Sequence, residues 1–575
     1  MAFGLAMNWL SSVIPDLSRR VVDDGIVARD GGAVVRLAGL LLVFAIVRYA
    51  LTGLRREVSG RVGTDVEVAL RDRLARHLLA LEPAWHDRAQ TGQLLSRATS
   101  DVRAVRYFVS WGLPFLFLDV ALFVFVVARM ALLDHGLTLL ALLVAPALLV
   151  AAVRYNRKLH GAYWQVQQET GELTTIVEEN AAGVRVVKAF GREDEEERKL
   201  AGRAAAVRYW NLHAAGLRGF YSPLMGLLPQ LSIAAVLLVG GTRAAGGAIT
   251  LGTLVGFNLY LITLSSPLKG LGVLLAFAQR ASASANRVFE LLQVEPSIAD
   301  RPGAAPLPPP APGGGRGLEV RFEDVVFRHP DAAEPSLDGV DLVIPAGGRV
   351  ALVGATGSGK SSLVALVTRE YAAEAGRVVV GGHDVTGLTL ESLRRAVGVV
   401  HQEPQLFSAT LRENVTLGRP DATDDEALAA LRAAGADDVV DALPDRLDTV
   451  VGEQGWTLSG GQRQRVALAR ALLLHPRVLL LDDALSHVDV ATEARILAGL
   501  GDALGDATVL LVAHRRATLR LADEVVLLDG GRVTAVGTHD ELLAGQPRYR
   551  ALLAHQAASV DRLALTATDR SEAAR

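Results

Sequence analysis

Two short segments of the chain carry residues that could act on a nucleoside triphosphate. The first is "GATGSGKSS", which follows directly on the apolar run "RVALV". Glycines let the backbone turn tightly enough for successive N–H groups to face phosphate oxygens, and the N-terminus of a following helix favours negative charge. The candidate phosphate-binding residues are Gly354, Ala355, Thr356, Gly357, Ser358, Gly359, Lys360, Ser361 and Ser362. In this pattern Lys360 neutralises the terminal phosphates and the Ser361 hydroxyl binds Mg²⁺, so the segment predicts a bound nucleoside triphosphate.

The second segment is "LLLDDALSHVD", residues 479–489, in which an apolar run stops at two consecutive aspartates. The run predicts a buried strand, and Asp482 at its end is placed to hold Mg²⁺ through the water shell of the ion. Asp483 is a base for the attacking water, an impaired version of such a base, or only a solvated neighbour of Asp482. The residue types alone leave these three interpretations open.

The composition indicates that part of the chain lies in lipid. Half of the 575 residues are apolar (50%) and the mean hydropathy is +0.29, which is high for a soluble enzyme of this length. The net charge of -3 provides no basic field that would attract nucleic acid, so no nucleic-acid partner is expected. Cysteine is absent, which excludes disulfides, thiolate metal sites and cysteine nucleophiles.

Apolar blocks long enough to cross a bilayer as helices are confined to the first half of the chain. The predicted spans are residues 34–53, 112–132, 136–153, 222–241 and 251–275, with residues 1–17 as a weaker sixth. Residues 1–17 lack the basic N-terminal region and the small-residue cleavage site of a signal peptide. Long arginine-rich segments follow the spans at 34–53 and 136–153, which predicts that these segments and, with six spans, both termini are cytoplasmic.

A proline-rich seam separates this half from a region of different composition. Residues 301–317, "RPGAAPLPPPAPGGGRG", cannot form a helix or strand and are predicted to be a linker. Beyond them, β-branched runs alternate with helical patterns, as in a parallel α/β domain. The predicted domains are a transmembrane domain at 1–295, a linker at 296–317, an α/β P-loop NTPase domain at 318–555 and a C-terminal tail at 556–575.

One further segment, "LSGGQRQRVALARALL" from Leu458 onward, indicates a family. Together with the phosphate loop and Asp482 it resembles the ATP-binding cassette of ABC transporters, and the apolar half resembles the six-span exporter domain fused in front of it. The resemblance implies ATP and Mg²⁺ as ligands and a dimer in which ATP lies between the phosphate loop of one cassette and the signature of the other. The signature residues are Ser459, Gly460, Gly461 and Gln462.

The resemblance also assigns roles to residues outside these segments. Gln402, in "VVHQEPQLF", matches the glutamine that senses the Mg²⁺ and the attacking water, and His514, in "LLVAHRR", matches the histidine that contacts the γ-phosphate. Glu453, in "VVGEQG", matches an acidic residue near contacts between the chains. The implied catalytic residues are Asp483, His514 and Gln402, and the implied metal ligands are Ser361, Gln402 and Asp482. In the apolar half, "WHDRAQTGQLLSR" resembles the first cytoplasmic loop, which docks on a cassette.

Two departures from the family pattern bear on catalysis. His329 stands where an aromatic residue, usually tyrosine, stacks on adenine, so ATP binding is expected to be weaker but retained. Asp483 stands where competent cassettes carry glutamate, and its carboxylate falls roughly 1 Å short of the water, a misplacement that can slow hydrolysis on the order of 100-fold. This chain is therefore predicted to be the subunit of a heterodimer whose own ATP site hydrolyses weakly; a homodimer with a slow aspartate base is the alternative.

These features predict an ATPase that exports a small molecule across the cytoplasmic membrane as one half of a dimeric ABC exporter. Its partners are a second half-transporter, the lipid bilayer and the cargo, and the ATPase domain is cytoplasmic. The charged residues noted near the spans, Arg129, Arg154 and Lys269, lie at helix ends, which favours a drug-like, lipid or other amphiphilic cargo. The alternatives are a siderophore-type importer with an exporter fold and a regulatory ATP-binding membrane subunit that transports nothing.

Overall fold

The protein is described by a computed structural model that divides into two compact units. It describes residues 1–310, 315–330, 332–452, 457–513, 515–519 and 522–554. One unit contains Met1–Leu78 and Thr91–Val294, and the other contains Leu79–Gln90 and Glu295–Arg575. The short segment 79–90 therefore belongs with the C-terminal unit, although it lies between two long helices of the first half.

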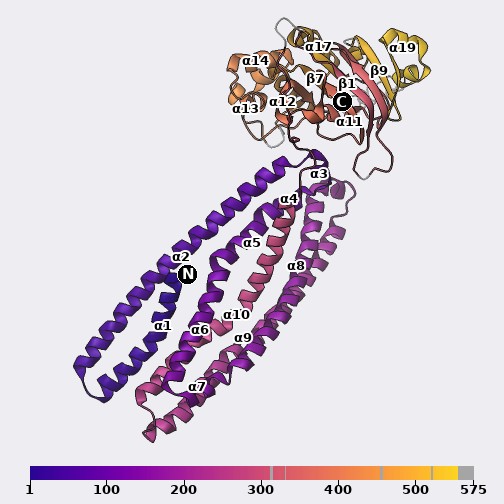
Figure 1. Ribbon diagram of the computed structural model, residues 1–575. Coiled ribbons are helices and arrows are strands. Elements are labelled where there is room, and N and C mark those ends of the chain that lie inside the picture. Colours follow the sequence, from indigo (N-terminus) through magenta and orange to yellow (C-terminus); the bar gives the residue numbers. More distant parts are fainter. Residues whose placement is uncertain (311–314, 331, 453–456, 514, 520–521, 555–575) are drawn as a thin grey trace. The chain divides into compact units, whose positions relative to one another are not determined.

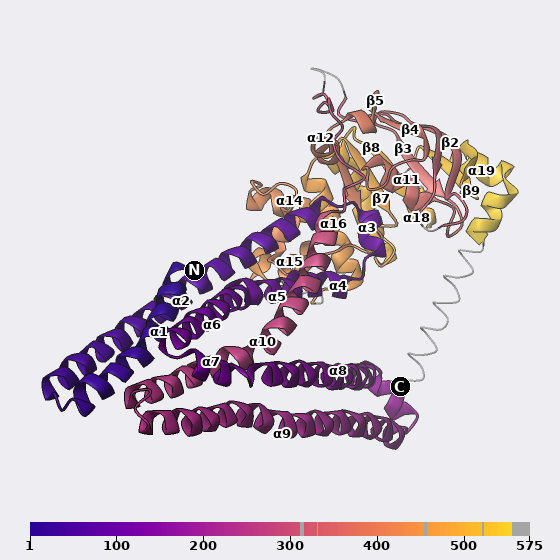
Figure 2. The same ribbon diagram turned by 60° about the horizontal axis from the view of Figure 1, so that its bottom comes forward.

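The first unit is entirely helical (Figure 1). In chain order its elements are α1 (Ala2–Arg20), the π-helical η1 (Val21–Val27), α2 (Gly31–Ala80), α4 (Thr91–Ser96), the π-helical η2 (Arg97–Asp101), α5 (Val102–Tyr107), the π-helical η3 (Phe108–Gly112), α6 (Leu113–Leu133), α7 (His135–Leu142), α8 (Ala145–Ala189), α9 (Glu193–Ala245) and α10 (Leu251–Leu292). The helices α8 and α9 run side by side along much of their length in both views (Figures 1 and 2).

Within the described residues, four helical stretches are long and apolar enough to cross a membrane. They are Gly31–Ala80, Thr91–Leu133, His135–Ala189 and Glu193–Ala245, and a shorter apolar stretch, Leu251–Ser265, opens α10. They include the predicted spans at 34–53, 112–132, 136–153 and 222–241. The weaker block 1–17 coincides with α1, and the total of six spans stays a prediction.

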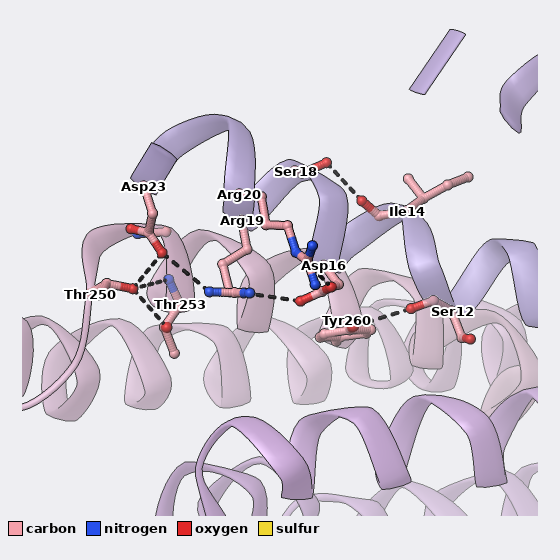
Figure 3. Close-up of polar contacts among 11 residues, drawn as sticks. Ser12, Ile14, Asp16, Ser18, Arg19, Arg20, Asp23, Thr250, Thr253 and Tyr260 are labelled. Atoms are coloured by element: carbon pink, nitrogen blue, oxygen red, sulfur yellow. Dashed lines mark hydrogen bonds and ion pairs between the residues drawn. The ribbon is translucent and has the colours of Figure 1, made fainter. Parts of the chain in front are cut away.

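Polar contacts join the end of α1 and the following η1 to the start of α10 (Figure 3). The Asp23 carboxylate accepts hydrogen bonds from the Thr250 hydroxyl at 2.7 Å and from the Gly252 backbone N–H at 2.8 Å. The Arg19 guanidinium lies between Asp16, at 3.0 Å, and Asp23, at 3.5 Å. The first backbone N–H groups of a helix have no partner within the helix. At the start of α10, the Asp23 carboxylate accepts a hydrogen bond from one such N–H group and from a hydroxyl group.

The second unit combines helices and strands. In chain order its elements are α3 (Pro83–Arg88), β1 (Val320–Phe327), β2 (Leu337–Ile344), β3 (Arg349–Val353), α11 (Lys360–Val367), β4 (Ala375–Val380), β5 (His383–Asp384), the 3-10 helix η4 (Val385–Gly387), α12 (Leu390–Ala396), β6 (Val397–Val400), α13 (Leu411–Val415), α14 (Asp424–Ala433), α15 (Asp437–Ala442), the 3-10 helix η5 (Arg446–Asp448), α16 (Gly460–Leu473), β7 (Val478–Asp482), α17 (Val490–Leu504), β8 (Thr508–Val512), α18 (Arg516–Leu519), β9 (Glu524–Asp529), β10 (Arg532–Gly537) and α19 (His539–Gly545).

The strands form two sheets. The larger has the order β10-β9-β3-β8-β7-β6, in which β10 is antiparallel to its neighbour and the other pairs are parallel. The smaller sheet, β2-β1-β4-β5, is antiparallel, whereas the sequence had indicated only a parallel arrangement. Buried and more exposed residues alternate along β1 and β2, which is typical of antiparallel strands with one face covered.

Successive residues of β3 point into two different apolar cores. Ala351 and Val353 pack with residues of α14, α16 and α17, while Val350 and Leu352 pack with residues of the smaller sheet and α11. Because all four side chains are buried, β3 is held on both faces. The loop that leaves its carboxyl end therefore starts from a rigid element, as ligand-binding loops of parallel sheets usually do.

Candidate functional site

The loop between β3 and α11 has a backbone that only glycine fits at several positions. Gly357 and Gly359 adopt φ values of 80° and 99°, in the left-handed region. At Gly354 a Cβ atom would lie 2.2 Å from the Leu528 carbonyl oxygen, and at Gly359 it would lie 2.5 Å from that of Ser336. The loop therefore folds closely against its neighbours, with backbone groups in place of side chains at its centre.

The Lys360 ammonium group lies inside this loop. It donates hydrogen bonds to the carbonyl oxygens of Gly354 and Ala355, at 3.0 and 2.7 Å, and to the Ser358 hydroxyl at 3.3 Å. Lys360 and Ser358 are buried, whereas Ala355 and Thr356 are exposed at the rim of the loop. A cation held by carbonyl oxygens in a glycine-rich loop is well suited to exchange these contacts for phosphate oxygens.

The charges of two carboxylates at the end of β7 affect the pKa of the Lys360 ammonium group. Burial lowers the pKa of Lys360, and the charges of Asp482 and Asp483 oppose that shift. Asp482, only 8% exposed, is the last residue of β7 and pairs with Val512 of β8. Asp483 follows at a φ of 49°, a left-handed conformation that aspartate tolerates better than most residues. The structure thus brings both predicted acids close to the phosphate loop.

The arrangement fits Mg²⁺ bound together with a phosphate. Among the described residues no group of three or more His, Asp or Glu side chains could hold a metal ion alone. Mg²⁺ instead keeps several waters and takes one or two protein ligands plus substrate phosphate. Asp482 and the exposed Ser361, the second residue of α11, provide one carboxylate and one hydroxyl of this kind.

His329 contacts α11 and two aromatic rings. Its Nε2 atom lies 2.9 Å from the hydroxyl of the buried Ser362, and its ring meets those of Phe327 and Tyr371 edge to face, at centroid distances of 4.7 and 5.2 Å. Ser362 therefore points toward His329, away from the open side of the loop. Stacking of His329 on adenine stays a prediction.

Tyr371 links this region to α3, and sequence analysis did not single it out. Its hydroxyl donates a hydrogen bond to the Asp87 carboxylate, and together with burial this contact raises the pKa of Tyr371. A second contact joins the same segment to the linker, because the Ser297 backbone N–H donates to Glu82 Oε2 at 3.1 Å. The segment 79–90 is thus hydrogen-bonded to residues beside the phosphate loop.

The signature segment forms the start of α16. Ser459 is the N-cap: its hydroxyl accepts from the Gln462 backbone N–H at 3.3 Å, and Gln462 Oε1 accepts from the Ser459 N–H at 2.7 Å. Gly460 and Gly461 begin the helix, and a Cβ at Gly461 would lie 2.6 Å from the His487 carbonyl oxygen. The helix N-terminus, with its free N–H groups, is suited to bind an anion.

Gln464 is the residue of this region that sequence analysis missed. Its side chain is fully buried (0% exposed) and its Nε2 lies 3.3 Å from the Gln402 carbonyl oxygen, 2.9 Å from the Ser486 hydroxyl and 3.0 Å from His487 Nδ1. Its Oε1 accepts from the His487 N–H at 2.9 Å. One amide therefore joins the signature helix to two loops. The only available signal was a polar residue on the buried face of α16.

A cavity of about 510 Å³ opens beside these loops. It is lined by residues of the Gln402 loop, the start of α16 and the loop after β7: Gln402, Glu403, Pro404, Gln405, Gly460, Arg463 and His487. The Gln402 side chain is exposed here, and only its backbone carbonyl has a described partner in α16. The structure therefore does not bring Gln402 into a described contact with Asp482 or Ser361.

The phosphate loop and the signature are two separate half-sites in this chain. The described hydrogen bonds of the Lys360 side chain stay within its own loop, and those of Ser459 stay within its own helix cap. The predicted site residue His514 and the loosely assigned Glu453 lie outside the described residues. Chemically, one half-site can hold a Mg²⁺-bound triphosphate, and the other offers N–H and hydroxyl donors to an anion.

Comparison with known proteins covers both units. A family model described as the ABC transporter transmembrane region matches residues 1–268, and one described as ABC transporter matches residues 337–486. The structure of a bacterial Atm1-family ABC exporter with ATP bound aligns with a TM-score of 0.79 at 28% identity, over 96% of this chain and 97% of that one. The predicted fold class, a helical transmembrane domain followed by a P-loop ATPase domain, is thereby confirmed.

Curated relatives of two kinds are similar over most of the chain. A multidrug efflux ATP-binding/permease protein of Mycobacterium tuberculosis is 40% identical over 555 residues, which are 96% of this chain and 46% of that protein. This chain thus spans about half the length of that relative. An ATP-dependent lipid A-core flippase of Syntrophus aciditrophicus is 32% identical over 540 residues, which are 94% of this chain and 88% of the relative.

Proposed function

The chain belongs to the ABC transporters, and from this premise we propose that it couples ATP binding and hydrolysis to the export of a small amphiphilic molecule across the cell membrane. The observation that carries this proposal is the hydrogen bond between Tyr371 and Asp87. It joins a residue beside the phosphate loop to α3, which lies in the chain between two helices long enough to cross a membrane. A change in the cassette can thereby be transmitted to the spans.

We further propose that the transporter works as a dimer and that its ATPase domain is cytoplasmic. The two half-sites of this chain support the dimer, since each lacks what the other provides. The Lys360 loop with its two carboxylates holds the triphosphate and Mg²⁺, and Ser459 with the N–H groups of α16 contributes donors to the γ-phosphate bound by the second cassette. Closure of the two cassettes around ATP then drives a movement of the transmembrane helices relative to one another.

Within that dimer we propose that the site built on this chain's own phosphate loop hydrolyses ATP weakly. Ser361 and Asp482 would hold Mg²⁺, which would neutralise charge on the phosphates. Asp483 is the residue placed to orient the water, and Gln402 and His514 keep their proposed roles beside the metal and the γ-phosphate. Aspartate is one methylene shorter than glutamate, so the water is positioned roughly 1 Å from its best place, a displacement that can reduce the rate on the order of 100-fold.

The second chain is then a different half-transporter, whose glutamate catalyses rapid hydrolysis against this chain's signature. The intact capping box of Ser459 and Gln462 and the buried bridge made by Gln464 support an active signature. The names of the relatives favour export: one is a multidrug efflux protein and the other a lipid flippase. A siderophore-type importer and a regulatory subunit that transports nothing are the two competing functions.

Transport in sealed vesicles tests the proposal. The chain, with a co-expressed partner half-transporter, is reconstituted in proteoliposomes, and ATP is supplied to the cassette side. We expect ATP-dependent accumulation of an amphiphilic dye inside those vesicles whose cassettes face outward. Movement of cargo only toward the cassette side would establish import instead, and the absence of ATP-dependent movement of any cargo would favour the regulatory subunit.

A further inference from the structure

The membrane-spanning helix α6 contains one carboxylate, which lies away from both helix ends. The sequence had indicated charges only at the ends of the spans. Asp119 is the seventh residue of α6 (Leu113–Leu133). At the helical rise it lies about 9 Å from the first residue of α6 and about 21 Å from the last, well inside a hydrocarbon layer of about 30 Å. An ionisable group at this depth costs several kcal/mol and usually has a function.

The Asp119 side chain lies on the face of α6 that turns into the helix bundle. Residues four, seven and eleven positions apart share one face of a helix, which places Asp119 in line with Phe115 and Val126. Val126 is fully buried (0% exposed) in a cluster with Phe257 and Tyr260 of α10. The neighbours of Asp119 on the opposite face are exposed, among them Phe117 at 57%, Val120 at 52% and Val124 at 55%.

No described group neutralises this carboxylate. Among the residues that the structure describes, none forms a hydrogen bond or an ion pair with Asp119. Two other polar groups of the bundle do have partners: the preceding residue, Leu118, accepts a hydrogen bond at its carbonyl oxygen from Asn8 of α1, and the Thr52 hydroxyl of α2 donates to Arg48 O at 2.7 Å and lies 3.2 Å from Met7 Sδ. Asp119 therefore differs from the structural polar groups that fasten α1 and α2.

An aromatic ring beside Asp119 already faces a cation. One turn toward the start of α6, the Phe115 ring lies 5.4 Å from the Arg55 guanidinium carbon. Arg55 Nε is buried without a hydrogen-bond partner, and Arg55 forms no described ion pair with Asp119. This stretch of the interior face thus combines a ring that accommodates positive charge with a carboxylate that has no counter-ion.

We propose that Asp119 selects positively charged amphiphiles as the cargo of this transporter, an inference that rests on the export function proposed above. In a medium of low dielectric constant an opposite charge on the cargo is attracted far more strongly than in water, and a phosphate group is repelled as strongly. The names of the two relatives refer to drugs and to lipid A-core, and within these classes the carboxylate favours molecules that carry a positive charge.

Three probes of similar shape separate charge from hydrophobicity. Tetraphenylphosphonium, triphenylphosphine oxide and tetraphenylborate carry positive, zero and negative charge, and their binding to the full chain in nanodiscs is measured by equilibrium dialysis without ATP. We expect the wild-type protein to prefer the phosphonium over the borate. Asp119→Asn should weaken phosphonium binding roughly tenfold and leave binding of the phosphine oxide within about twofold. Asp119→Glu should retain the preference, and Asp24→Asn, at an exposed acid outside the bundle interior, should bind like the wild type.

Several outcomes would overturn the selection of cations. Absent phosphonium binding, stronger binding of the borate, or equal binding of the phosphonium by wild type and Asp119→Asn would each do so. Restored phosphonium binding in Arg55→Gln/Asp119→Asn would show that the carboxylate serves only to balance Arg55. ATP-driven uptake is measured separately in proteoliposomes: cation-selective binding without uptake of any probe would contradict the export function while leaving the selectivity of Asp119 intact.

Discussion

The phosphate-loop half-site and the signature half-site of this cassette differ in how far each is complete. In the signature half-site, Ser459 closes a capping box and Gln464 joins three segments through one buried amide, so its donors are held in place before any ligand arrives. In the phosphate-loop half-site, Lys360 is bound by carbonyl oxygens that a phosphate must replace, and the residue that should orient water is the short Asp483. The contrast supports the proposal that rapid hydrolysis takes place at the site built on the partner's phosphate loop.

The difference between the two half-sites depends on very few atoms. The phosphate loop retains the glycines, the lysine and the carboxylate that we propose for binding of MgATP, and we propose that Asp483, which follows Asp482, limits hydrolysis. A site can therefore keep its affinity for ATP while its rate falls, because affinity depends on many contacts to the phosphates and the rate depends on the placement of one water. Each of the following changes is designed to affect one half-site and spare the other.

Damage to the signature should have the largest effect. Ser459→Arg places a bulky cation where the donors of α16 face the partner's nucleotide, and we expect ATP turnover of the assembled transporter to fall on the order of 100-fold. Ser459→Thr, which can still cap the helix, should keep most of the turnover. Steady-state phosphate release measures both. Unchanged turnover in Ser459→Arg would mean that this signature does not serve the rapid site.

Removal of the lysine should affect binding more than turnover. Lys360→Ala deletes a charge-assisted contact to the phosphates, so ATP affinity at this chain should fall at least about tenfold, while turnover at the other site changes less than about threefold. Lys360→Arg keeps the charge and serves as the control. Photo-crosslinking of azido-ATP to each chain reports affinity and phosphate release reports turnover. Abolished turnover would contradict a passive role for this phosphate loop.

The amide bridge is expected to have a smaller, structural effect. Gln464→Ala leaves the Gln402 carbonyl, the Ser486 hydroxyl and the His487 N–H without their buried partner, which should reduce the free energy of unfolding of the cassette by about 1 to 3 kcal/mol. Gln462→Ala, in which only the exposed cap contact is lost, should cost about 1 kcal/mol or less. Thermal unfolding in detergent compares the two. Equal losses would show that the buried bridge does not stabilise the signature half-site.

Sequence alone predicted the segments that carry local signals. The glycines of residues 354–359 are required by backbone geometry within a few residues, so their pattern is readable without a structure. Long apolar helices were likewise predicted from composition, because a bilayer demands a continuous apolar stretch. The antiparallel sheet β2-β1-β4-β5 was not predicted, although Gly381 and Gly382 between β4 and β5 are typical of a hairpin turn; only the pairing of β1 with β4 joins strands distant in the chain and has no local signature.

Residues whose role depends on distant contacts were missed or placed differently. Gln464 is one polar residue among several in its segment until the fold buries it against two loops. The link between Tyr371 and Asp87 joins residues far apart in the sequence, and His329 reaches Ser362 only because β1 lies near α11. Asp119 can be seen in the sequence, but only the structure shows that it lies on the face of α6 that is turned into the helix bundle.

One measurement tests the proposed weakness of the Asp483 site most directly. Two copies of the chain are joined in one polypeptide, so that both nucleotide sites combine this phosphate loop with this signature, and ATP hydrolysis is measured in nanodiscs. The account predicts slow hydrolysis by the wild-type tandem, retained ATP binding, and a rate on the order of 100-fold higher after Asp483→Glu in both copies. Rapid hydrolysis by the wild-type tandem, or no gain from Asp483→Glu, would contradict it.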